Sequence, residues 1–202
     1  MKKKIKALII ILIIALVTSA AKTANESGES QRENNYTAVA VEKTVLKRME
    51  YTSLGVPSVD SSFKTWMSYR AVTNKKSPQY RLINTCGWAD NEGFMRCSSE
   101  KELGIDQDYY MIALGSYYGT NIGTKYRITL STGKVFYGIL ADCKADKHTN
   151  KTNQYAKNND VVEFLVDTRK LNSGVKYHGN VNVYKPLSGS VIKIERIDFI
   201  QE

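Results

Sequence analysis

Residues 111–142 constrain the fold more than any other part of the chain, because they combine short apolar runs with closely spaced glycines and tyrosines. Residues 126–130 alternate, with apolar side chains on one face and polar side chains on the other. A turn signal at 131–133 then leads into a second apolar run at 135–140. The pattern predicts three short β-strands and places Asp142 at the end of the last one. Loops at such strand ends present functional groups on a rigid scaffold.

Other parts of the chain add further strands and one helix to this β-rich segment. Strands are expected where β-branched and aromatic residues are bounded by turn residues, at 37–42, 79–86, 94–97, 161–167, 179–184 and 189–197. The apolar spacing Phe63, Trp66, Met67 predicts a short amphipathic helix over 63–72, which packs on the sheet. The sequence therefore predicts a mainly β fold with a short helix near its N-terminal end and an added β-hairpin.

The hairpin brings two of the three cysteines together. If it turns at Asn91-Glu92, residues whose numbers sum to 183 face each other, and Cys86 then opposes Cys97. We predict a Cys86–Cys97 disulfide, which leaves Cys143 as a free cysteine that is either buried or merely tolerated. A thiol nucleophile at Cys143 assisted by His148 is the less favoured alternative. No metal site is expected, because the cysteines and acids lack any recognised ligand spacing.

The N-terminal residues predict export. Four lysines within the first six residues precede an apolar run at 7–17 and small residues at 18–21, a signal-peptide pattern shorter than the roughly 20 residues of a spanning helix. We therefore expect a signal peptide at 1–21, a disordered linker at 22–35 and a single domain at 36–202. An uncleaved membrane anchor is the alternative for 1–21. Either form is extracytoplasmic: secreted, or associated with the cell wall or membrane.

Charge and motifs narrow the function classes. The formal net charge of +9 falls to +5 (9 − 4) once the four N-terminal lysines are removed. No basic cluster is interleaved with aromatic residues, so nucleic acid is not an expected partner. Phosphate-binding loops, nucleophile elbows, zinc-protease helices and aspartic-protease motifs are absent from the sequence, and no cofactor is expected.

A resemblance to a known family is carried by three parts of the sequence: residues 122–128, Gly133 and Asp142. They resemble the core of the 3D (Asp-Asp-Asp) domain, which is related to the catalytic domain of MltA-type lytic transglycosylases. The resemblance covers about residues 109–168 and implies a six-stranded double-psi β-barrel. Asp142 matches the second aspartate of the family and Glu163 replaces the third, whereas residues 114–116 contain no acid at the place of the first. Cys143-Lys144 follows Asp142 where the family has its glycine. The chain also resembles secreted proteins of low-GC Gram-positive bacteria in general, which implies no function.

The resemblance implies action on the glycan of the cell wall by a monomeric protein. Asp142 would be the catalytic acid of a lytic transglycosylase or glycoside hydrolase, and Glu163 its partner. The expected lining of the groove is Tyr117, Tyr118, Lys144 and His148. The missing first acid leaves a competing hypothesis, a non-catalytic exported protein that binds glycan or another protein.

Overall fold

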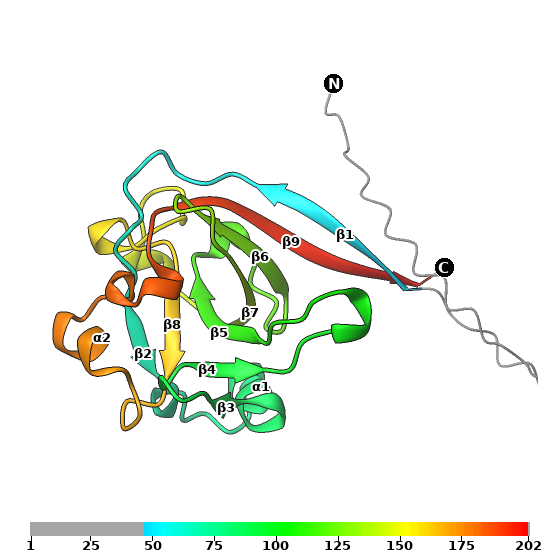
Figure 1. Cartoon of the computed structure of the whole chain (residues 1–202), viewed down its shortest axis with the longest axis horizontal. Coiled ribbons are helices and arrows are strands. Elements are labelled where there is room, and N and C mark those ends of the chain that lie inside the picture. The colour runs from blue at the N-terminus through cyan, green and yellow to red at the C-terminus, as the bar shows by residue number, and fades with distance from the viewer. Residues whose placement is uncertain (1–46, 202) are drawn as a thin grey trace, which may run out of the picture. The chain divides into compact units, whose positions relative to one another are not determined.

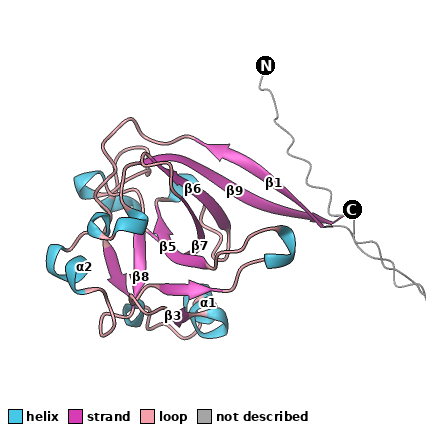
Figure 2. Cartoon of the chain, viewed as in Figure 1, coloured by secondary structure: helices cyan, strands magenta, loops and turns pink. Residues whose placement is uncertain are grey.

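The protein is mainly β. The computed structural model describes residues 47–201, and within them the chain forms nine strands and two α-helices (Figures 1 and 2). The strands are β1 (Lys47–Leu54), β2 (Trp66–Ser68), β3 (Trp88–Ala89), β4 (Met95–Cys97), β5 (Tyr109–Leu114), β6 (Lys125–Leu130), β7 (Val135–Cys143), β8 (Glu163–Val166) and β9 (Val191–Gln201). The helices are α1 (Pro78–Cys86) and α2 (Ser173–His178). The predicted signal peptide, linker and strand 37–42 lie outside the described residues.

The strands pair in the order β1-β9-β6-β7-β5-β4-β3, and β8 joins β5 to β2 off this path. Two pairs are parallel, β5 with β7 and β2 with β8, and the others are antiparallel. Strands β1 and β9 form a long two-stranded ribbon that extends to one side of the molecule (Figure 1). Within residues 47–201 the pairing does not close, so the expected six-stranded barrel is not confirmed, whereas the mainly β class is.

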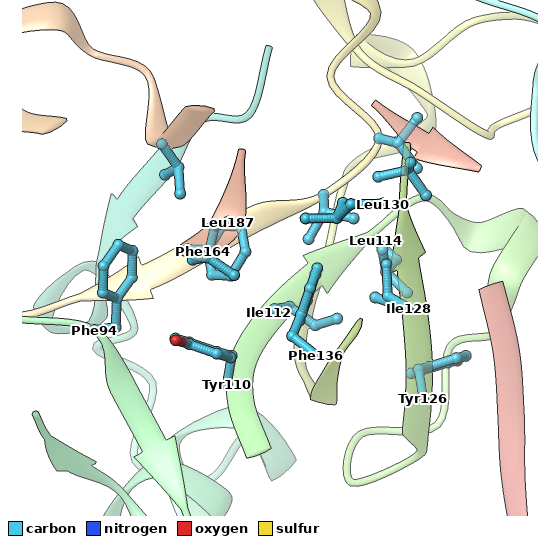
Figure 3. Packing of buried hydrophobic residues seen from close by; sticks show 14 of the residues in the cluster. Phe94, Tyr110, Ile112, Leu114, Tyr126, Ile128, Leu130, Phe136, Phe164 and Leu187 are labelled. Carbon is cyan, nitrogen blue, oxygen red and sulfur yellow. The ribbon is translucent and has the colours of Figure 1, made fainter. Parts of the chain in front are cut away.

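Strand β5 lies at the centre of the sheet because its sequence is apolar on both faces. All six of its residues are buried, as expected for a strand covered from both sides. Tyr110, Ile112 and Leu114 contribute to one hydrophobic cluster with Phe136 and Phe164 (Figure 3). The second cluster takes the alternate residues of β5 and the packed side of α1. The sheet therefore separates two cores.

The structure corrects two of the predicted elements. Residues 63–72 contain β2 and a 3₁₀ turn instead of a helix, since Trp66–Ser68 pair with β8. Residues 79–86 form helix α1 instead of a strand, because Ser77 caps Tyr80 N–H and Pro78 occupies the first helical turn.

Other predicted elements change in register or extent. The hairpin pairs Trp88 with Arg96 and Ala89 with Met95, one position away from the expected register. Cys86 is therefore at the end of α1 rather than in a strand, yet the Cys86–Cys97 disulfide forms as predicted. The expected strand at 179–184 is a 3₁₀ turn that follows α2, a helix that was not predicted.

Candidate functional site

Strand β5 brings Asp142 and Glu163 to the same face of the sheet. Ala113 pairs with Asp142 on β7 and with Glu163 on β8. Directly paired residues point to the same face, and two strand spacings put their Cα atoms roughly 10 Å apart. The methyl group of Ala113 is the only side chain on β5 between them. The two acids that the resemblance singled out are thus neighbours across one small residue.

An irregularity in β7 produces this arrangement. Ile112 pairs with Leu140, but the next residue, Ala113, pairs with Asp142, so the register shifts by one residue at Ala141. Such a bulge re-aims the side chain that follows it. Without the shift, Ala141 would lie opposite Ala113. The bulge is therefore what puts a carboxylate at this position of the sheet.

The carboxyl group of Glu163 lies in a partly buried, charged environment. Burial raises the pKa of Glu163, and the neighbouring Asp160 and Asp142 raise it further, whereas Lys144 and a hydrogen bond from the Thr65 side chain act in the opposite direction. A carboxyl group with a raised pKa retains its proton closer to neutral pH, as a general acid requires. Of the two acids, Glu163 has the environment of a proton donor.

A buried ion pair lies beside Glu163. Lys144 Nζ is 2.5 Å from Asp160 Oδ2, and 4% and 2% of the two side chains are exposed. Thr65 binds the same carboxylate twice, with its N–H 3.3 Å from Oδ1 and its hydroxyl 2.5 Å from Oδ2. Lys144 was predicted to contact substrate from the groove wall, but its ammonium group is buried and paired. It acts on the site through its charge.

Asp142 is partly exposed, as Glu163 is. Its carboxylate accepts a hydrogen bond from Cys143 N–H at 2.9 Å and a longer one from Gln79 Nε2 at 3.4 Å. Gln79 comes from the first turn of α1, which the disulfide fixes at the other end through Cys86. Asp142 remains partly exposed and forms no salt bridge with any described residue.

The predicted groove aromatics divide into a core residue and a surface residue. Tyr118 is 3% exposed and belongs to the first core cluster, so it is a packing residue. Tyr117 is 48% exposed on the 3₁₀ turn Ser116–Tyr118. His148 is exposed on the turn Asp146–His148. The hydroxyl group of Ser116 donates a 2.6 Å hydrogen bond to Asp146 and so links this turn to the turn Ser116–Tyr118. Neither Tyr117 nor His148 forms a hydrogen bond or ion pair with the two acids of the described site.

These loops cluster where two parallel strands end. The carboxyl ends of β5 and β7 are Leu114 and Cys143, and β8 begins beside them at Glu163. Sites in sheets with parallel strands commonly lie outside these ends. The acids, the ion pair and both turns therefore belong to one end of the sheet. Two surface hollows of about 450 and 500 Å³ lie elsewhere, and neither is lined by Asp142 or Glu163.

Cys143 does not have the environment of a nucleophile. Burial raises the pKa of its thiol, and Asp142 and Asp146 raise it further. A reactive thiol needs the opposite shift of its pKa.

No group of three or more histidines, cysteines or acids able to hold a metal occurs among residues 47–201. No described helix is long and apolar enough to cross a membrane.

Sequence reasoning missed three residues of the site: Thr65, Gln79 and Asp160. Asp160 follows Asn158 and Asn159, which both have positive φ, at 56° and 59°. Asparagine tolerates this left-handed conformation better than other residues with a side chain. The sequence Asn-Asn-Asp was thus a signal for a tight turn that delivers a carboxylate.

Comparisons with protein-family models, with curated proteins and with solved structures find no match for this chain.

Proposed function

We propose that this protein acts outside the cytoplasm on the glycan of the bacterial cell wall, which it cleaves at the end of the sheet that holds Glu163 and Asp142. The observation that carries the proposal is the pairing of both acids with Ala113, which places two carboxyl groups of unequal environment on one face. Glycosidic bonds are cleaved by such carboxyl groups, one of which must hold a proton.

The roles of the two acids are exchanged relative to the resemblance. Glu163 is the proton donor, because burial raises its pKa. Asp142, which accepts hydrogen bonds from Cys143 N–H and Gln79 Nε2, is the acid that orients the sugar or stabilises developing positive charge. A backbone separation of roughly 10 Å leaves room for a sugar ring or a water molecule between the two side chains.

The position of the site suits a polymer. The acids lie at an open end of the sheet rather than in either of the two surface hollows, and an extended chain could cross this end without entering a cavity. The two parallel strand pairs, β5 with β7 and β2 with β8, are also compatible with a double-psi-like arrangement. We further propose that the protein is exported and works as a monomer.

The test is mass spectrometry of purified peptidoglycan incubated with the full-length protein. Release of anhydro-sugar fragments is expected from a lytic transglycosylase, and hydrated fragments from a hydrolase. Glu163→Gln should lower the rate by at least about 100-fold, the usual worth of a general acid. Asp198→Asn is the matched control, because Asp198 is a partly exposed acid on β9 whose ion pair is with Arg196. Equal activity of Glu163→Gln and wild type would refute the assignment.

Binding without cleavage is the second candidate, favoured by the lack of an acid at 114–116. Wild type that sediments with insoluble cell wall but releases no fragments would support it. Loss of sedimentation in Asp142→Asn would then locate the binding surface.

A further inference from the structure

An amine and a carboxyl group lie in contact in the interior of the protein. Lys144 Nζ is 2.5 Å from Asp160 Oδ2, and both side chains are almost completely buried. The two residues come from opposite ends of one loop. Lys144 directly follows β7, where its N–H bonds Leu114 O at 2.9 Å, and Asp160 lies three residues before β8. The fold therefore holds a nucleophile against an electrophile and shields both from water.

Three other lysines show how this pair differs. Lys125 and Lys193 also pair with acids, but their side chains are partly exposed, so water can solvate their charges. Lys64 is completely buried, but its ammonium group donates to two backbone carbonyl oxygens, at 2.6 and 3.0 Å, and reaches Asn182 Oδ1 only at 3.5 Å. Lys144, by contrast, is both buried and in contact with a side-chain carboxyl group.

Thr65 holds both oxygen atoms of the Asp160 carboxyl group. Its hydroxyl group donates to Oδ2 at 2.5 Å, and its backbone N–H is 3.3 Å from Oδ1. Thr65 is itself fixed, because its carbonyl oxygen accepts a 3.0 Å hydrogen bond from Phe164 N–H. Nucleophilic attack on a carboxyl carbon is assisted by a donor to the oxygen that becomes negatively charged and by a donor to the oxygen that leaves. Thr65 supplies one donor to each oxygen.

We propose that Lys144 and Asp160 condense to an amide, so that an isopeptide bond joins the two side chains. Lys144 Nζ passes one proton to Asp160 Oδ2 and attacks Asp160 Cγ. The Nζ–Cγ bond forms, the Cγ–Oδ2 bond breaks, and Oδ2 leaves as one water molecule that carries two protons from Nζ. An ammonium group and a carboxylate thus become a neutral amide and water. Atoms and charges balance, and no oxidant, cofactor or second protein takes part.

Proximity and burial both favour this reaction. A nitrogen in contact with Oδ2 lies roughly 3 Å from the adjacent carbon, which is a near-attack distance. Groups held in such a geometry react as if their concentration were about 10⁵–10⁸ M. Two charges removed from water are costly to bury even when they are paired, and the amide removes both of them. The reaction therefore converts a buried ion pair into a neutral covalent link.

The link would close the loop 145–159 covalently beside the two acids of the site. Before it forms, Lys144 and Asp160 act on Glu163 in opposite directions, and the amide removes both charges together. The bond goes beyond the proposed function and does not depend on it, because no glycan takes part in its formation.

The experiment is tandem mass spectrometry of tryptic peptides from the full-length protein after reduction and alkylation. Trypsin requires a free lysine side chain, so it should cleave after Lys64 but not after Lys144. The expected product is peptide 135–147 joined to peptide 158–169, with a mass one water below the sum of the two. Separate peptides 135–144 and 158–169, without a joined product, would overturn the proposal. The wild-type digest gives this answer even if a variant does not fold.

Two substitutions of Asp160 form a matched pair. Asp160→Asn and Asp160→Ala both remove the negative charge, but only asparagine keeps a carbonyl carbon that Lys144 can attack, with ammonia leaving in place of water. Asp160→Asn should give the same joined peptide, and Asp160→Ala should give none. Lys144→Arg keeps the positive charge without an amine and should also give separate peptides. A joined product in Asp160→Ala or Lys144→Arg would place the link at other residues and refute the assignment.

The competing product is an ester between Asp160 and the Thr65 hydroxyl group, which is also 2.5 Å from Oδ2 and would release the same water. The ester would join peptide 158–169 to peptide 65–70 instead, and hydroxylamine would cleave it but leave an amide intact. Finding this ester would overturn the role of Lys144. A joined peptide 135–147 that resists hydroxylamine would support the isopeptide bond, whether or not the protein cleaves glycan.

Discussion

Replacing Lys64 by methionine tests how the core holds a charge. Lys64 is completely buried, and its ammonium group donates to Ser62 O at 3.0 Å, to Gly189 O at 2.6 Å and to Asn182 Oδ1 at 3.5 Å. Ser62 lies two residues before Lys64, whereas Asn182 and Gly189 belong to a segment 118 and 125 residues away in the sequence. Methionine has a similar unbranched shape and no charge, so it removes the ammonium group with little change in packing.

The structure predicts the sign and the size of the pH effect. Burial lowers the pKa of Lys64 from 10.5 to about 8, against the opposite influence of Asp160 and Asp60. The difference (10.5 − 8) corresponds to about 3 kcal/mol. Between these two values the unfolded chain binds more protons than the folded protein, so the stability should rise with pH. The slope approaches about 1.4 kcal/mol per pH unit in this window.

Other groups oppose this rise at higher pH. Burial raises the pKa of Cys143 above 9.0 and that of Tyr126 above 10.0, to about 12. Each contributes stability that is lost as the pH rises beyond its unfolded value. Because they are present in both proteins, the difference in unfolding free energy between wild type and Lys64→Met isolates the contribution of Lys64.

The assay is urea denaturation of both proteins at about pH 7.5 and about pH 9.5. The stability of wild type relative to Lys64→Met should increase by roughly 1–2 kcal/mol between these conditions. The absolute difference at pH 7.5 is less informative, since two carbonyl oxygens lose a donor while the variant avoids the burial of a charge. A relative stability that does not change over this range would show that Lys64 titrates normally, and the reasoning would be refuted.

Three further predictions concern stability. A Cβ at Gly115 would lie 2.0 Å from Asn153 O, so Gly115→Ala should lower the unfolding free energy by about 2 kcal/mol, and unchanged urea unfolding would contradict the close contact. Reduction of Cys86–Cys97, which closes a loop with a sequence separation of 11, should cost about 3 kcal/mol, measured as a lower Tm with a thiol reductant than without it. Phe94 is fully buried and contacts three aromatic rings, so Phe94→Ala should cost about 3–5 kcal/mol by urea unfolding; a loss under 1 kcal/mol would contradict its central position.

The strands at the centre of the sheet could be predicted because local pattern and burial agree there. The alternation at 126–130 became β6, whose residues alternate between partly buried and buried. The run at 135–140 became the first part of β7. Such segments have the period of a strand and the β-branched and aromatic residues that fit a pleated surface.

The errors arose where a short segment satisfied two patterns. Residues 63–72 have helical apolar spacing, yet Trp66 and Met67 are needed on opposite faces of β2 to reach the two cores. Residues 79–86 contain β-formers, but the Ser77-Pro78 start signal outweighed them. Tertiary packing decided the first case and capping decided the second.

The two acids of the site could be named from the sequence, but their relation could not. This relation depends on the one-residue register shift at Ala141, which no local sequence pattern indicates. The shift determines whether the Asp142 side chain lies on the same face of the sheet as Glu163 or on the opposite face. In a β7 without this shift, Ala141 would lie opposite Ala113 and Asp142 would face the first core in place of Cys143, where an unpaired carboxylate is costly. The bulge thus links the stability of the sheet to the geometry of the site.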